Sequence, residues 1–381
     1  MMVIGIDATN IGGGGGITHL IEIINNYDYY YFKNKVSKII IFGSEKVLNQ
    51  IPEKDYIEKF TDPLLNSNIL YRFYFQLFKF DKLLANKCDI LLSLTGDYFG
   101  DFKPLVSMSR NMLLYEKSNW KLISDKKELF KFWSSLQKQK ICFRKSSGII
   151  FISYFAKSVI VKELKLIEKD LVVIPHGVST KFFFNHIHNP IEYYTFDFPF
   201  KFLYVSTVHV YKHQWNVVQA IYELRKKGFP VELHLVGGVI YQPAGDKLNK
   251  SIKKFDSKNE FVFNHGHVSY NQIQDFYKTV NGIIFASTCE NMPNILIESM
   301  ASGIPIACSD KNPMPEFLGD SNFYFNSHDV NSIVRSLEIV LRNPDLRIHE
   351  AKNNLVKSTS YNWALTSKNT FNYILKIYKE S

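Results

Sequence analysis

The chain has 381 residues, of which 46% are hydrophobic and 22% are charged, and its formal net charge is +10. This length predicts more than one domain, and the composition excludes a disordered, collagen-like or disulfide-scaffold protein. No apolar run reaches the ~20 residues of a membrane-spanning helix, and the N-terminus has no signal-peptide pattern. The four cysteines are scattered without a CxxC pair, which indicates reduced, buried thiols in a cytoplasmic protein.

In the first half of the chain, short apolar runs alternate with helical patterns. Strands are predicted at 3–8, 38–43, 90–94, 104–108 and 148–153, and a helix at 17–26, and the run 172–177 closes this half of the chain. These strands are continuously apolar rather than alternating, which is typical of a parallel sheet covered on both faces.

A second series of the same kind follows an aperiodic linker at 185–200. Strands are predicted at 202–207, 231–238, 261–266, 282–287 and 305–310, and helices at 215–226, 273–280 and 294–302. The predicted fold class is therefore α/β, with two doubly wound Rossmann-like domains over 1–184 and 185–363 that face a cleft. Ligands of open α/β sheets bind beyond the carboxyl ends of the strands, so the cleft is the expected site.

Segment 287–309 carries the most informative pattern. A strand ends in a loop with Glu290 and Pro293, a helix with Glu298 follows, and a turn at Gly303 leads to the next strand. Backbone N–H groups at the start of this helix, together with its dipole, form an anion site. Two carboxylates at this spacing can accept hydrogen bonds from ligand hydroxyls at two points.

This segment resembles the Glu-x7-Glu signature of family 4 retaining glycosyltransferases with the GT-B fold, including Met-Ala-x-Gly-x-Pro at 300–305. The resemblance implies that Glu290 contacts the donor sugar and that Glu298 holds the ribose hydroxyls of the nucleotide. The backbone around Asn291, Met292, Pro293 and Asn294 would meet the sugar and the phosphates. The alternative is that the two glutamates are a loop charge and a surface helix residue.

The resemblance is strong over 200–345 and weak over 1–145. The tail at 364–381 is similar to the family's last helix, which crosses back onto the first domain.

Segment 205–212 resembles the part of the family that binds the donor diphosphate. Ser206 and Thr207 stand where the family usually has Gly and Arg, whereas Lys212 is retained. The resemblance implies that Lys212 neutralises the charge that grows on the leaving diphosphate, assisted by Ser206 and Thr207. The alternative for Lys212 is a solvated surface lysine.

Gly266 and Val268 resemble the family's base-binding segment, where backbone groups pair with the nucleobase edge. The neighbouring His265 and His267 are interpreted as turn residues rather than metal ligands. The sequence contains no Asp-x-Asp, so neither a metal nor another cofactor is expected.

Three features of the first domain are candidates for contacts with the substrates. The run Gly12–Gly16 does not fit G-x-G-x-x-G, and the resemblance implies that Gly14 and Gly15 lie against the donor phosphates and the acceptor. Arg110 stands where the family commonly has a His near the sugar, and it is expected to reach the cleft. Asp97 ends a strand and is expected to face the acceptor, whereas His176 is given a structural role.

A basic and aromatic face is predicted over 121–145, where eight Lys and Arg accompany two acids, and over 72–84. Such a helix can lie on an anionic bilayer at the inner face of the cell membrane. The alternative is a stripe that faces the core, with a solvated basic side. No nucleic-acid-binding motif accompanies these residues.

These features predict a metal-independent, retaining hexosyltransferase. It would move a sugar from a nucleotide diphosphate sugar to a glycan acceptor, expected to be a lipid-linked precursor of surface polysaccharide or O-antigen. A nucleotide-sugar epimerase with the same fold and a non-catalytic scaffold that binds nucleotide sugar are the two alternatives.

Overall fold

The computed structural model describes residues 1–12, 14–166, 169–184, 186 and 188–381. The chain divides into two compact units. Unit 1 comprises Met1–Lys117, Ser124–Gly177 and Asn362–Ser381, and unit 2 comprises Ser118–Ile123 and Val178–Tyr361. The division falls at Gly177, whereas the sequence places the domain boundary after 184. Residues 185 and 187 of the expected linker lie outside the described residues.

Unit 1 is built on a seven-stranded sheet with the order β3-β2-β1-β4-β5-β6-β7, and every pairing in it is parallel. The strands are β1 (Met2–Asp7), β2 (Val36–Phe42), β3 (Ile57–Phe60), β4 (Ile90–Ser93), β5 (Leu105–Ser109), β6 (Gly148–Phe151) and β7 (Asp170–Val173). Every residue of β4, β5 and β6 is buried, as expected for continuously apolar strands in a sheet with two covered faces.

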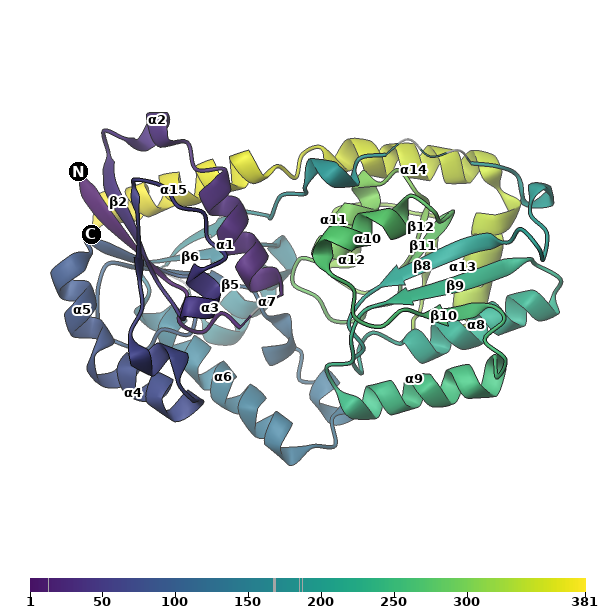
Figure 1. Cartoon of the computed structure of the whole chain (residues 1–381), viewed down its shortest axis with the longest axis horizontal. Helices are drawn as coiled ribbons and strands as arrows, with labels where there is room; N and C mark the ends of the chain where they lie inside the picture. The colour runs from purple at the N-terminus through teal and green to yellow at the C-terminus, as the bar shows by residue number, and fades with distance from the viewer. Residues whose placement is uncertain (13, 167–168, 185, 187) are drawn as a thin grey trace. The chain divides into compact units, whose positions relative to one another are not determined.

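The helices of unit 1 are α1 (Gly15–Asn25), α2 (Tyr29–Phe32), α3 (Glu45–Leu48), α4 (Ile69–Phe78), α5 (Phe80–Lys87), α6 (Lys126–Lys145), α7 (Tyr154–Leu164) and α15 (Trp363–Glu380). The strand order reverses direction between β1 and β4. Because crossovers are right-handed, helices that follow strands on the two sides of this point cover opposite faces of the sheet. Figure 1 shows α1 with α15 on one face and α5 with α6 on the other.

The last helix, α15, is fixed to unit 1 by hydrogen bonds from two of its side chains. Ser367 Oγ donates to the Ile23 carbonyl at 2.7 Å, and Tyr373 Oη donates to the Asp170 carbonyl at 2.8 Å. The chain therefore returns to its first unit after completing the second.

Unit 2 is built on a six-stranded parallel sheet with the order β10-β9-β8-β11-β12-β13. The strands are β8 (Phe200–Val205), β9 (Val231–Val236), β10 (Val262–Asn264), β11 (Gly282–Phe285), β12 (Ile306–Ser309) and β13 (Tyr324–Phe325). The helices are α8 (Gln214–Lys226), α9 (Gln242–Phe255), α10 (Tyr270–Tyr277), α11 (Asn294–Ala301), α12 (Met314–Leu318), α13 (Val330–Arg342) and α14 (Pro344–Ser358). Its order reverses between β8 and β11.

The prediction of two doubly wound α/β sheets is confirmed. In each unit the loops that follow the two strands at the reversal point are the expected place for a ligand. These loops follow β1 and β4 in unit 1, and β8 and β11 in unit 2. All four cysteines are buried and unpaired, as predicted.

Candidate functional site

The loops after β8 and β11 bring together two of the three charged residues, Lys212, Glu290 and Arg110, that the sequence singled out as catalytic. Lys212 Nζ pairs directly with Glu290 Oε1. The Lys212 residue is only 7% exposed, so the pair is held away from bulk water, where charge interactions are stronger. The alternative of a solvated surface lysine is therefore wrong. Lys212 Nζ also lies over the rings of Tyr211, at 5.0 Å, and Phe285, at 5.8 Å.

Hydrogen bonds fix the two loops to each other beside this ion pair. Thr288 N donates to the Tyr211 carbonyl at 2.9 Å, and Tyr204 Oη donates to the Lys212 carbonyl at 2.7 Å. The His213 ring nitrogen lies 3.1 Å from Thr288 Oγ1. Burial, followed by the neighbouring His328, lowers the pKa of His213 to about 3, so this ring is neutral and holds the loop rather than an anion.

Ser206 and Thr207 begin the same loop. Ser206 is buried and its hydroxyl donates to the Thr207 carbonyl at 3.2 Å, whereas the Thr207 residue is exposed. Gly237 approaches this backbone so closely that a Cβ there would lie 2.0 Å from the Ser206 carbonyl oxygen. With Ser-Thr in place of Gly-Arg, Lys212 is the one Lys or Arg side chain of segment 205–212.

The second loop leads directly into the N-terminus of α11. Pro293 is the N-cap and its side chain makes no capping hydrogen bond. The preceding Asn291 and Met292 are buried, at 5% and 7% exposure, and Asn294 opens the helix. Backbone N–H groups at such an end, with the dipole behind them, favour an anion.

Glu298 lies one turn into α11 and is 5% exposed. Its Oε1 accepts a hydrogen bond of 2.8 Å from Tyr270 Oη, while its Oε2 has no partner among the described residues. Burial raises the pKa of Glu298 to about 7, although the Tyr270 hydrogen bond acts in the opposite direction. Glu298 is therefore not the surface helix residue of the alternative reading.

Tyr270 and Lys181 are neighbours of Glu298 that sequence reasoning missed. Lys181 Nζ lies 3.7 Å from the centroid of the Tyr270 ring, and its charge favours the ionised form of Glu298. No motif marks either residue. Only the order of the elements brings η4 (Thr180–Phe182), α10 and α11 together.

Gly266 has the left-handed backbone that glycine allows, with φ of +63°, and nothing lies within 4 Å of its missing Cβ. Its carbonyl accepts from Gly237 N at 2.7 Å, which ties this turn to the loop after β9. Val268 is half-buried. The nearby His265 ring lies 3.1 Å from His234, and among the described residues no group of three potential metal ligands forms.

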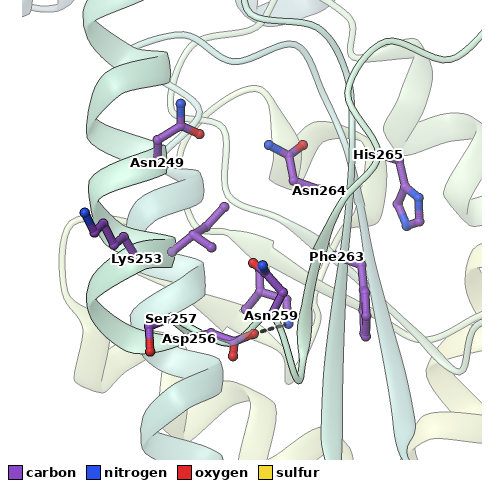
Figure 2. A pocket seen from close by; sticks show the side chains of 10 residues that line it. Asn249, Lys253, Asp256, Ser257, Asn259, Phe263, Asn264 and His265 are labelled. Carbon is purple, nitrogen blue, oxygen red and sulfur yellow. Dashed lines mark hydrogen bonds between the residues drawn. The ribbon is translucent and has the colours of Figure 1, made fainter.

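A hollow of about 690 Å³ lies at the edge of unit 2, between α9 and β10 (Figure 2). The hollow is lined by the carboxylate of Asp256, which already accepts hydrogen bonds from the protein backbone. The donors are the N–H groups of Glu260, Phe261 and Val262, at 2.8–2.9 Å. Asn249, Lys253 and Asn264 line the rest of it (Figure 2). The hollow contains none of the predicted site residues.

In unit 1, Arg110 contacts the loop that contains the run Gly12–Gly16. Its Nη2 donates to the Gly15 carbonyl, and a Cβ at Gly16 would lie 3.3 Å from Nη1. Burial lowers the pKa of Arg110 to about 10, so it remains a cation at neutral pH. Gly14 has φ of +61° with open space around it, and Gly13 of the same run lies outside the described residues.

Two carboxyl groups meet at the reversal point of unit 1, after β1 and β4. Asp97 accepts from Asn10 Nδ2 at 2.7 Å and from Thr95, and Asp7 accepts from Thr9 Oγ1 at 2.6 Å. Burial, followed by the charge of Asp97, raises the pKa of Asp7 to about 7, and burial also raises that of Asp97. Only Asp97 was singled out from the sequence.

His176 stacks between His19 and Trp363, with ring centroids 4.6 and 5.4 Å away. All three residues are buried. The stack joins the start of α15 to α1, which agrees with a structural role.

Residues 195–357 match the family described as "Glycosyl transferases group 1". The matched segment lies within unit 2. The segment contains Lys212, Glu290 and Glu298, so the residues with the clearest geometry lie inside the match.

The O-antigen chain mannosyltransferase B of Escherichia coli is 21% identical over 173 residues, which cover 45% of this chain and 44% of that protein. The chain spans less than half the length of the curated relatives it matches.

Two solved structures share the fold along almost the whole chain. Sucrose-phosphate synthase from Thermosynechococcus elongatus has a TM-score of 0.77 at 14% identity, covering 100% of both chains. HepE of Anabaena in complex with UDP and glucose has a TM-score of 0.71 at 16% identity, covering 99% of this chain and 100% of that one. At these identities the likeness establishes the GT-B fold of two Rossmann-like domains.

Proposed function

We propose that this protein transfers a hexose from a nucleotide diphosphate sugar to a glycan acceptor, with retention of the anomeric configuration. The observation that carries the proposal is the meeting of Lys212 and Glu290 at the reversal point of unit 2, beside the N-terminus of α11. A cation, a carboxylate and a helix N-terminus are the groups that a diphosphate linked to a sugar requires.

Each group has a role in the proposed reaction. Lys212 and the first turn of α11 receive the diphosphate, and they stabilise the negative charge that develops as the bond between the anomeric carbon and the phosphate oxygen breaks. Glu290, released from its ion pair, orients the sugar hydroxyls. The acceptor hydroxyl attacks the anomeric carbon from the face that the diphosphate leaves, and its proton passes to the departing phosphate oxygen. This sequence needs no protein base and no metal.

The nucleoside end of the donor is assigned to Glu298 and Gly266. Glu298 Oε2, buried and without a partner among the described residues, would accept a hydrogen bond from a ribose hydroxyl. Backbone groups around Gly266 and Val268 would meet the base. HepE, which shares the fold, is known in complex with UDP, and this supports a uridine-type nucleotide.

For the acceptor we propose a lipid-linked precursor of surface polysaccharide or O-antigen. The likeness of part of the chain to an O-antigen chain mannosyltransferase supports this class. Unit 1 would bind the acceptor, with Asp97 and Arg110 as the first residues to test. The reaction would take place in the cytoplasm at the inner face of the cell membrane. No helix of the described chain is both long and apolar enough to cross a membrane.

A transfer assay with retention as its readout tests the proposal. The protein would be incubated with UDP-, GDP-, ADP- and dTDP-sugars and membrane lipid extract, and the anomeric configuration of any product determined by NMR. We expect one donor series to give a retained glycoside, and Glu290→Gln to lower kcat by about 100-fold or more. A product with inverted configuration, or release of an epimerised nucleotide sugar without transfer, would contradict the proposal.

A further inference from the structure

Helix α4 exposes most of its apolar side chains and is in this sense inverted relative to an ordinary surface helix. Seven of its ten residues are large apolar or aromatic side chains between 43% and 74% exposed: Ile69, Leu70, Tyr71, Phe73, Tyr74, Leu77 and Phe78. A surface helix of a water-soluble domain normally turns its apolar stripe inward and its polar side outward. Here the outward side carries most of the apolar surface.

The buried side of α4 confirms the inversion. Within the helix only Phe75 and Gln76 are buried, at 1% and 5% exposure. Gln76 Nε2 donates to Thr9 Oγ1 at 2.8 Å, and Phe75 packs against Phe80 with ring centroids 5.5 Å apart. A polar side chain is thus hydrogen-bonded inside the unit while Leu70 and Phe78 face outward. The register is fixed, so the exposed apolar side is a stable surface of unit 1.

Helix α6 extends this surface with basic residues. Lys138 Nζ of α6 lies 5.2 Å from the centroid of Phe73 on α4, so the two helices are neighbours (Figure 1). Helix α6 buries one stripe, formed by Leu136, Gln139, Cys142 and Phe143. On its other side Phe130 and Trp133 are 65% and 52% exposed, with ring centroids 5.8 Å apart. The alternative reading, a stripe that faces the core, is confirmed for the buried side of α6, whereas membrane binding stays a prediction.

The charge on α6 is strongly positive. It contains Lys126, Lys127, Lys131, Lys138, Lys140, Arg144 and Lys145 against one acid, Glu128. Within the described chain, Lys126, Lys127 and Arg144 have no acidic group within 4 Å, and all three are exposed. Their charge is therefore available to a negatively charged partner.

We propose that α4 inserts into the interfacial layer of an anionic phospholipid bilayer, with α6 beside it as the electrostatic contact. Large aliphatic side chains accompanied by Tyr and Trp, and flanked by lysines, match the layered chemistry of a bilayer surface: acyl chains, the headgroup boundary and anionic phosphates. This contact deepens the proposed function, because it identifies the element that brings the enzyme to a lipid-linked acceptor.

Vesicle flotation without any nucleotide sugar tests this contact, so its outcome is separate from that of the transfer assay. The full chain is mixed with vesicles of phosphatidylcholine alone or with phosphatidylglycerol. We expect binding to the anionic vesicles. The double variant Leu70→Ser/Phe78→Ser should lower the partition coefficient by at least about tenfold, because both side chains would lose their apolar burial in the bilayer. Lys126→Glu/Lys127→Glu should weaken binding mainly at low salt.

The matched control is Tyr193→Ser/Phe198→Ser, which removes two aromatic side chains of unit 2 that are both 54% exposed. It should bind vesicles as the wild type does. Equal loss in both double variants, or no binding of the wild type to anionic vesicles, would overturn the proposal. Sedimentation velocity provides the remaining outcome: a dimer that becomes monomeric only in the α4 variant would identify a second copy of the chain as the occupant.

Discussion

Lys212 and Glu290 lie 78 positions apart in the chain and form an ion pair within one loop cluster. In this state each neutralises the other, which removes the cost of leaving a lone charge in a poorly hydrated place. A diphosphate carries more negative charge than one carboxylate and can compete for Lys212. Under the proposed function, the pair would keep Lys212 ordered before the donor arrives, although Thr207 stands where the family usually has Arg.

The raised pKa of Glu298 predicts a pH dependence of donor binding. The ionised carboxylate accepts hydrogen bonds from ribose hydroxyls more strongly than the protonated group, and with a pKa of about 7 its ionised fraction falls as the pH falls from 8 to 6. The affinity for a nucleotide sugar should therefore drop about tenfold over this range. Titration calorimetry with an intact nucleotide sugar, whose phosphates do not titrate in this range, measures it.

Two substitutions, Glu298→Gln and Tyr270→Phe, distinguish the role of the Glu298 carboxylate from that of its hydrogen bond with Tyr270. Glu298→Gln should bind more weakly and lose the pH dependence. Tyr270→Phe removes a hydrogen bond that favours the ionised form, so it should move the dependence to higher pH without abolishing binding. A wild-type affinity that stays constant between pH 6 and 8 would contradict the ribose role of Glu298.

Candidate site residues could be predicted from the sequence where they belong to a recognisable motif. The motif places three charged residues at fixed distances along the chain from the preceding strands: Glu290, Glu298 and Lys212. Their positions are constrained because they lie in a loop or near a helix N-terminus. Neither Tyr270 nor Asp7 belongs to such a motif. Tyr270 meets Glu298 through the packing of two helices, and the raised pKa of Asp7 depends on its burial beside Asp97.

At the scale of elements, the strands buried on both faces were the most predictable. β4, β5, β6, β11 and β12 follow apolar runs closely, because every residue in them is buried. β3 and β13 were missed: β3 is half-buried along its length, and β13 has only two residues. Helix α4 could be seen as apolar but not as inverted, because its sequence does not show which side packs on Thr9.

The turn between α9 and β10 depends on one buried carboxylate, seen in Figure 2. Asp256 is 4% exposed and accepts from three successive backbone N–H groups. Asp256→Ala should lower the free energy of unfolding by about 3 kcal/mol, because it leaves buried donors without partners. Urea denaturation measures this change.

Asp246→Ala is the control on the preceding helix α9, since Asp246 is exposed and, among the described residues, accepts a side-chain hydrogen bond from Gln242. It should change the free energy by less than about 0.5 kcal/mol. Equal effects of the two substitutions would show that the carboxylate of Asp256 does not hold the turn.

At the scale of the whole molecule, both units have a doubly wound sheet, but only unit 2 contains a segment that matches a known family. Both sheets reverse strand order once, yet the family match covers only 195–357. A doubly wound sheet requires apolar strands and helices of suitable length, which many sequences satisfy. Under the proposed function, a donor site would also constrain individual side chains and glycines of unit 2. Unit 1 shows no comparable sequence signal, so the acceptor was the least predictable partner.

The central claim is that a nucleotide diphosphate sugar binds where the loops after β8 and β11 meet. A thermal-shift panel of UDP-, GDP-, ADP- and dTDP-sugars tests it most directly, since a ligand that binds only the folded protein raises its Tm. We expect one nucleotide series to raise the Tm of the wild type and of Lys226→Ala, an exposed-lysine control on α8, and to do so far less for Lys212→Ala. An equal shift in all three proteins, or no shift with any donor, would contradict the claim.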